Sequence, residues 1–214
     1  MLRFIALAAI SLLLIVSCKD KNCPNNLKYQ IPYTAAPIQD TFQIADTILI
    51  EMNFSDQLTD LNGSVENTFR NFDFKIQLQC DRFDIDPPQG KAVSFMDVFP
   101  TVGEVIPRGL PSSGISYFEV LPIYEAEHYR FKAAVVLKQQ GTFWFAISPY
   151  TDEMLAPFEI KGNCDHIPLH FTNKVNDGDP TANNYHLLKS SPVDAYRNIT
   201  LERFGVGGFC FVVR

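Results

Sequence analysis

The sequence predicts a mostly β protein, built as a two-layer antiparallel β-sandwich with one short helix near the C-terminus. Three observations support this prediction. Apolar and polar residues alternate along several segments, which is the period of a strand with one buried face. Proline and glycine recur between those segments at intervals of roughly 8–15 residues, as in the turns of a sandwich or barrel. The chain holds 18 phenylalanines among its 214 residues, so it has large apolar side chains to fill a core between two sheets.

The first strands are predicted between residues 41 and 86. Most even-numbered positions of residues 42–54 are apolar, and most odd-numbered positions are polar. Residues 72–81 alternate more regularly still. A helix would scatter these apolar side chains around its circumference, so both segments are predicted to be strands. The parity inverts at Phe83 and Ile85, which predicts a β-bulge or a bend near residues 80–82.

A hairpin is predicted over residues 129–148. Residues 129–137 alternate, residues 138–141 form a turn in which Gly141 can adopt a positive φ, and residues 142–148 return as a strand. The remaining predictions are strands over residues 93–99, 116–124, 158–161, 167–172 and 209–213, a proline- and glycine-rich turn region over residues 107–114, and a loop over residues 176–180.

One helix is predicted close to the C-terminus. Ser191 suits the N-cap, Pro192 suits the first helical position, and Asp194 stands where a capping box places an acid. An irregular apolar stripe follows as far as Phe204, and Gly205 is a typical helix stop.

The predicted hairpin resembles part of an immunoglobulin-like sandwich. Gly141 precedes the alternating run Thr142-Phe143-Trp144-Phe145, as in strands E and F of Ig-like and cadherin-like domains. The resemblance covers about 20 residues and implies an Ig-like arrangement of the two sheets. The sequence lacks the Cys…Trp…Cys spacing of antibody domains.

The N-terminus has the pattern of an export signal. Arg3 precedes an apolar run over residues 4–16, which is shorter than the roughly 20 residues of a transmembrane helix. The run ends with Ile-Val-Ser directly before Cys18, and the chain then turns polar. This ending resembles the bacterial lipobox, which implies that residues 1–17 are a signal peptide and that Cys18 is lipidated.

A lipobox implies a bacterial lipoprotein held on a membrane by its acyl chains, since two or three chains anchor durably where one does not. Lys19, in place of the aspartate that resembles an inner-membrane retention signal, favours the outer membrane and leaves the periplasmic or surface face open. Residues 18–40 are interpreted as the lipidated cysteine and a tether, and residues 41–214 as one β-sandwich domain. As a whole, the chain resembles small uncharacterised lipoproteins of Bacteroidota-type bacteria, a family that implies no activity.

The other four cysteines are candidates for a structural disulfide. Lipidation of Cys18 leaves Cys23, Cys80, Cys164 and Cys210, and a protein outside the cytoplasm can form disulfides. Four cysteines allow three pairings, among which the sequence does not choose. Buried free thiols are an equally good interpretation, because Cys80 and Cys210 lie in apolar, strand-like runs.

The histidines do not form a predicted metal site. His166 and His170 lie close to Cys164, but Pro168 opposes a helix between them. On a strand, residues four apart stand roughly 13 Å from each other, so one zinc ion could not bind both without a bend. No metal or other cofactor is therefore predicted.

Two acidic segments are also interpreted structurally. Asp81, Asp84 and Asp86 could supply the carboxylate pair of a glycosidase, but Asp84 and Asp86 alternate with apolar neighbours like a solvated strand face. Residues 173–179 lack the ligand spacing of an EF-hand and are interpreted as a turn. The sequence also contains no Gly-x-Ser-x-Gly motif and no glycine-rich phosphate loop.

The net charge of the chain and the positions of its aromatic residues indicate which kind of partner the protein binds. With 18 basic against 24 acidic residues and a net charge of −6, the chain lacks the basic patches that nucleic acid requires. Trp144 has the opposite parity to Phe143 and Phe145, and with Tyr150 it forms a candidate platform for a sugar or a protein. Cover of Trp144 by a loop or helix is the favoured alternative.

The sequence therefore predicts a lipid-anchored, non-catalytic envelope protein that binds a protein or glycan partner. The alternative is a fimbrial subunit that assembles by exchange of the apolar C-terminal strand. A hydrolase ranks third, because the sequence shows no convergent set of reactive groups.

Overall fold

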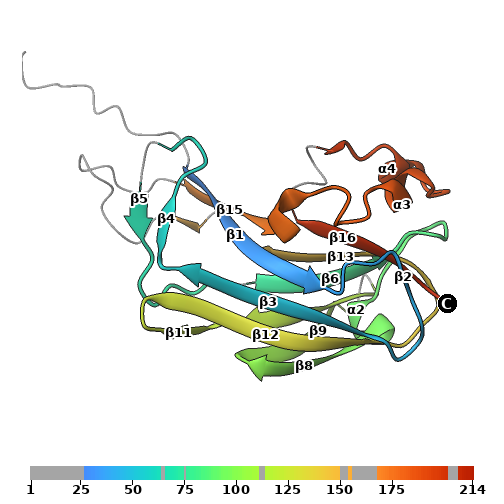
Figure 1. The fold of residues 1–214 in the computed structure, drawn as a ribbon, viewed down its shortest axis with the longest axis horizontal. Helices are drawn as coiled ribbons and strands as arrows, with labels where there is room; N and C mark the ends of the chain where they lie inside the picture. The colour runs from blue at the N-terminus through green and yellow to red at the C-terminus, as the bar shows by residue number, and fades with distance from the viewer. Residues whose placement is uncertain are drawn as a thin grey trace, which may run out of the picture.

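The computed structural model describes residues 27–63, 66–74, 76–110, 114–149, 154–155, 168–201 and 207–214. In these residues two mixed β-sheets pack together like a sandwich, accompanied by a few short helices (Figure 1). The mostly β class and the two layers are therefore confirmed. The Ig-like topology stays a prediction.

The first sheet has seven strands. In hydrogen-bonding order, six of them are β11 (Ile123–Glu125), β12 (His128–Leu137), β3 (Thr47–Ser55), β1 (Leu27–Ala36), β15 (Pro168–Val175) and β14 (Met154–Leu155), and β8 (Met96–Val102) also pairs with β12. β1 and β15 run parallel to each other. The prediction that the sheets are purely antiparallel is therefore wrong for the first sheet.

The second sheet also has seven strands. Its order is β2 (Thr41–Phe42), β16 (Gly208–Val213), β13 (Gly141–Pro149), β6 (Ile76–Arg82), β10 (Ile115–Leu121) and β9 (Glu104–Leu110), with β7 (Gln89–Gly90) also paired to β6. β16 and β2 are parallel, so this sheet is mixed as well. The short strands β4 (Gln57–Thr59) and β5 (Glu66–Thr68) form a separate pair at the opposite end of the molecule from the helices near the C-terminus (Figure 1).

The strand periodicity read from the sequence is confirmed in β3. Ile48, Ile50, Met52 and Phe54 are buried, and the residues between them are exposed. The same pattern fails at Ile44, which is 48% exposed because it lies in the turn between β2 and β3.

The predicted hairpin over residues 129–148 is wrong. β12 belongs to the first sheet and β13 to the second, so the intervening turn crosses from one layer to the other. β12 pairs with β3, β8 and β11, whereas β13 pairs with β16 and β6. A turn signal in the sequence specifies a reversal of the chain, but it does not specify which sheet receives the second strand.

The tether predicted over residues 18–40 is wrong for β1. Leu27, Tyr29, Ile31, Tyr33 and Ala35 alternate with polar residues and are all buried in the core. Between β3 and β15, β1 is an interior strand of its sheet. The folded domain therefore includes Leu27 and does not begin at residue 41.

Three further element predictions are wrong in whole or in part. The strand expected over residues 93–99 is confirmed from Met96, where β8 begins, but residues 93–95 belong to the helical turn α2 (Ala92–Phe95). This turn allows Ala92 and Phe95, three residues apart, to enter the core together. The turn region expected over residues 107–114 contains β9, an edge strand, where proline is tolerated. The helix expected after Ser191 is reduced to the single turn α4 (Asp194–Arg197).

Other short helices precede α4. They are the 3₁₀ turn η1 (Asn176–Gly178) and α3 (His186–Lys189). Val193, not Ser191, occupies the N-cap of α4 and makes no side-chain cap. The predicted strand over residues 158–161 lies outside the described residues. Within the described ranges, no helix has the length and apolar character needed to cross a bilayer.

The parity inversion after Cys80 has a different cause from the predicted bulge. β6 pairs with β13 in continuous register from Ile76 to Arg82, and the strand ends there. Phe83 is buried on the outer face of the second sheet, away from the main core. There it packs with Leu188 and Ile199 in a second, smaller apolar cluster. Figure 1 shows α3 and α4 gathered over β16 and β13 on this side.

Candidate ligand-binding site

The outer face of the second sheet carries a cavity of about 500 Å³ beside α4. Polar and apolar atoms contribute about equally to its surface. The polar side chains among its described lining residues are Gln79, Asp81, Gln89, Lys91, Ser116 and Tyr196. These residues come from β6, β7, β10, α4 and the chain just after β7, so segments far apart in the sequence build the site together.

Strand geometry places Asp81 in this cavity. Ile76, Leu78 and Cys80 of β6 enter the core, so the odd-numbered Asp81 faces outward. Gly90 of β7 lies opposite Asp81, and a Cβ on Gly90 would come within 2.8 Å of the Asp81 Oδ1 atom. Glycine at this position therefore leaves the room that the carboxylate occupies.

Tyr196 closes one side of the cavity. Its hydroxyl donates a hydrogen bond to Asp81 Oδ2 across 3.0 Å. Its ring stacks on Phe83, with ring centroids 5.5 Å apart, and meets Trp144 edge to face at 5.8 Å. The ring is thus held against the sheet by aromatic contacts, while the hydroxyl reaches the carboxylate.

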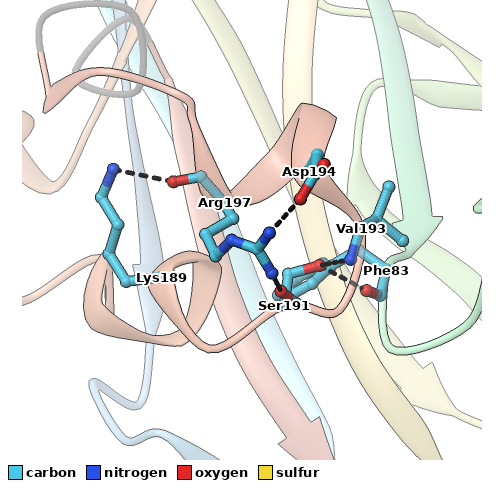
Figure 2. A network of polar contacts seen from close by, with 6 residues as sticks. All are labelled: Phe83, Lys189, Ser191, Val193, Asp194 and Arg197. Carbon is cyan, nitrogen blue, oxygen red and sulfur yellow. Dashed lines mark hydrogen bonds and ion pairs between the residues drawn. The ribbon is translucent and has the colours of Figure 1, made fainter.

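A polar network fixes the segment that carries Tyr196 (Figure 2). The Ser191 hydroxyl donates to the Phe83 carbonyl at 2.8 Å and accepts from the Val193 N–H at 3.1 Å. Arg197 donates to the Ser191 carbonyl and pairs with Asp194. Because Phe83 follows β6 directly, this network ties α4 to the strand that bears Asp81.

A second link in the same network connects α3 with α4. The Lys189 ammonium donates to the Arg197 carbonyl at 3.0 Å (Figure 2). It also donates to the Ile199 carbonyl at 2.8 Å. These bonds satisfy carbonyls at the end of α4, which is too short to satisfy them internally. The two short helices are therefore held as one unit over the sheet.

Burial in the cavity raises the pKa of both Asp81 and Tyr196. Desolvation raises the pKa of Asp81, and the hydrogen bond from Tyr196 opposes part of that increase. Desolvation also raises the pKa of Tyr196, and the neighbouring charge of Asp81 raises it further. Tyr196 is therefore a neutral hydroxyl donor at physiological pH.

Asp81→Asn is expected to raise the melting temperature at pH 7 and to have little effect at pH 3. Because the folded-state pKa of Asp81 lies above the unfolded value of about 3.9, the wild-type protein loses stability as the pH rises through the folded-state pKa. Asparagine does not ionise, and its oxygen can still accept from Tyr196. Thermal unfolding at both pH values measures the effect.

Asp86→Asn, at an exposed position, is the matched control and should leave the melting temperature nearly unchanged at both pH values. A change in melting temperature for Asp81→Asn that is the same at pH 3 and pH 7 would contradict the assignment of a buried, desolvated carboxylate.

The structure places the aromatic candidates as follows. Trp144 is half-buried under the α3–α4 unit and packs against Tyr196, so cover by helices, the favoured alternative, describes it better than a free platform. Tyr150 lies outside the described residues. Trp144 therefore supports the wall of the cavity instead of forming a binding surface of its own.

The cysteine candidates do not form the expected bond within the described chain. Cys80 and Cys210 are both buried free thiols. Cys80 belongs to the core between the sheets, whereas Cys210 belongs to the cluster on the outer face, and β13 lies between their strands. Cys80 and Cys210 therefore do not form a disulfide with each other, and the alternative interpretation of both as buried free thiols is confirmed. Cys18, Cys23 and Cys164 lie outside the described residues.

The acidic candidates separate in space. Asp84 forms an ion pair with Arg82 at 2.7 Å, and Asp86 is exposed, so Asp81 alone of the three lines the cavity. The interpretation of these residues as a solvated strand face is wrong, because Asp84 and Asp86 lie in the bend after β6 ends at Arg82. Asp81 does lie on the strand, but Tyr196 partly covers it. The residues that the structure describes contain no group of three His, Cys, Asp or Glu side chains placed to hold a metal ion.

The predicted turn over residues 173–179 is partly strand, since Asn173 belongs to β15. Asn176 Oδ1 accepts from the Ala35 N–H, and Asp179 Oδ1 accepts from the Thr181 N–H. These oxygens bind the protein's own backbone. His170 lies in β15, and His166 lies outside the described residues.

Sequence reasoning missed the role of Tyr196, Gln79, Gln89, Lys91 and Ser116. The parity inversion at Phe83 was the one local signal, because it marks a buried patch on the outer face. In chemical terms, the described lining of the cavity offers one carboxylate, one ammonium group and several neutral donors and acceptors. No model of a known protein family matches the chain, and the comparison with curated proteins finds no match.

Proposed function

We propose that the chain is a lipid-anchored, non-catalytic binding protein of the bacterial outer membrane, built on an Ig-like β-sandwich. The observation that carries the proposal is the cavity over Asp81. At about 500 Å³ it has the size of a small-ligand site, and its polar groups converge on one space.

A glycan fits this site better than a protein partner. Protein interfaces usually bury about 800 Å² per partner and centre on an apolar patch. The cavity instead is concave, and it combines amide, hydroxyl and charged side chains, which match the hydroxyl groups of a sugar, with an apolar surface of similar area, which matches its C–H groups. The proposed partner is therefore a glycan of the cell envelope.

A binding role is also favoured over hydrolysis. Glycoside hydrolysis uses two carboxyl groups about 5–9.5 Å apart. Among the described residues that line the cavity, Asp81 is the one carboxylate, and its Oδ2 atom already accepts a hydrogen bond from the Tyr196 hydroxyl. A single acceptor of this kind can orient a ligand without cleaving it.

The fimbrial alternative requires the last strand to be available for exchange. β16 instead pairs with β13 along its length. At its other edge, the Cys210 N–H donates to the Asn183 carbonyl and the Val212 N–H donates to the Asp40 carbonyl. Exchange would have to break both sets of bonds, so the geometry favours the binding role.

Cys18→Ala is expected to move the protein from the membrane pellet to the soluble periplasmic fraction. Loss of the acyl chains removes about 0.8 kcal/mol of membrane affinity for every buried CH₂ group. Fractionation of cells followed by immunoblotting measures the change. Cys23→Ala is the matched control and should stay in the pellet. Retention of Cys18→Ala in the pellet would reject the lipid anchor.

Gly90→Ala is expected to abolish glycan binding while the protein remains folded. The added Cβ would lie 2.8 Å from Asp81 Oδ1, so the carboxylate has to leave the position from which it meets the ligand. Oligosaccharides released from the envelope of the producing bacterium are the probe, and isothermal titration calorimetry is the measurement.

Gly109→Ala is the control for this variant, because a Cβ at Gly109 meets no atom within 4 Å. It should bind like the wild-type protein. Equal binding by Gly90→Ala and wild type would show that the cavity is not the site.

A further inference from the structure

We infer that the cavity recognises an uncharged sugar residue, whose hydroxyl groups donate to Asp81. This inference rests on the proposed function and names the ligand class of the same site. Three properties of the cavity lead to it: its balance of charge, the open oxygen of Asp81 and the neutral groups around that oxygen.

The charge of the lining is balanced. Asp81 supplies one negative group and Lys91 supplies one positive group, and the other lining residues that the structure describes are neutral. An anionic ligand would meet the carboxylate of Asp81 in a partly desolvated site, and a cationic ligand would meet the ammonium of Lys91. A ligand without net charge avoids both penalties.

Asp81 is already bound to a neutral hydroxyl. The Tyr196 O–H donates to Oδ2, which shows that this carboxylate accepts from an uncharged donor in the folded protein. A carboxylate offers about four acceptor sites, and no donor in the described part of the chain binds Oδ1. The Oδ1 atom lies over Gly90, at the lining of the cavity, where a ligand hydroxyl can reach it.

The neighbouring groups suit further hydroxyls. The Ser116 oxygen accepts from the Val93 N–H at 3.2 Å, which leaves its own proton to donate. Gln79 Nε2 donates to Gln77 Oε1 at 2.9 Å, which leaves its second amide hydrogen and its amide oxygen for a ligand. Gln89 has an amide donor and an amide acceptor at the same cavity. Ile115, 46% exposed at the same cavity, provides an apolar surface for the C–H face of a sugar ring.

Trp144 supplies a built-in reporter for the test. It is the only tryptophan of the chain, and its ring lies 5.8 Å from the Tyr196 ring that lines the cavity. A ligand that contacts Tyr196 should therefore change the fluorescence of Trp144. The full chain can be titrated with glucose, galactose, mannose and their disaccharides, and with glucuronic acid, glucosamine and glycine as charged or zwitterionic counterparts.

The expected result is a saturable fluorescence change with at least one neutral sugar and none with its charged counterparts. Asp81→Asn should weaken that binding at least tenfold, because it removes a hydrogen bond to a charged acceptor. Gly109→Ala should bind like wild type.

Several outcomes would overturn the inference. One is that glucuronic acid, glucosamine or glycine binds the wild-type protein as tightly as the neutral sugar that binds best. Another is that Asp81→Asn binds that neutral sugar with the same affinity as the wild-type protein. If no simple sugar binds while envelope oligosaccharides bind wild type and not Gly90→Ala, the inference fails and the proposed function stands. If neither class of probe binds, both fail.

Discussion

Gly208→Ala is expected to destabilise the protein by about 3 kcal/mol, a large effect for the addition of one methyl group. A Cβ on Gly208 would lie 2.9 Å from Trp144 Cδ1 and Cε2, and closer still to Nε1. The indole cannot simply move aside, because Tyr196 packs edge to face against it. A displaced indole would therefore disturb the packing of Tyr196 and the rest of α4 on the second sheet.

A double-mutant cycle tests this cause. In a Trp144→Ala background the obstacle is gone, so Gly208→Ala should change the free energy of unfolding by no more than about 0.5 kcal/mol. Chemical denaturation of the four proteins measures the coupling. Gly109→Ala controls for the loss of a strand glycine and should be nearly neutral. An equal cost of Gly208→Ala in both backgrounds would refute the indole contact as the cause.

Local periodicity predicted which face of a strand is buried. In β3, Ile48, Ile50 and Met52 enter the core as their spacing requires, because the pleat alternates side chains whatever the partner strand is. Pairing was less predictable. The turn before Gly141 joins two sheets instead of two neighbours, since β12 and β13 each find their partners elsewhere in the chain. β1 alternates in the same way, with Lys28 and Pro32 at exposed positions, but the proline, lysine and asparagine content of residues 18–40 favoured the interpretation as a tether.

The candidate site was predictable only in part. The parity of Trp144 placed it on the outer face, and the structure confirms that placement. The partner of Asp81 could not be predicted, because Tyr196 lies 115 positions away in sequence. Such a contact depends on how α4 packs over the sheet, and the capping signals around Ser191 predicted a longer helix than the single turn that forms.

Phe74→Ala is expected to destabilise the protein by about 4 kcal/mol and to lower the melting temperature by roughly 10 °C. Phe74 is 3% exposed and lies at the centre of an aromatic cluster at one end of the core. Its ring centroid lies 4.7–5.8 Å from those of five other rings, which belong to Phe54, Phe69, Phe72, Tyr129 and Phe171. Edge-to-face contacts of this kind add to the apolar area that the ring buries.

Phe99→Ala is the matched control, because Phe99 is 56% exposed and its loss should cost less than about 0.5 kcal/mol. Phe74→Leu should fall between the two, since leucine fills part of the space but makes no aromatic contact. Thermal and chemical unfolding give both quantities. A decrease of less than about 1 kcal/mol in the free energy of unfolding of Phe74→Ala would mean that the surrounding rings repack into the space that the Phe74 ring leaves. In that case the cluster stabilises the domain by its total apolar volume and not by the geometry of its ring pairs.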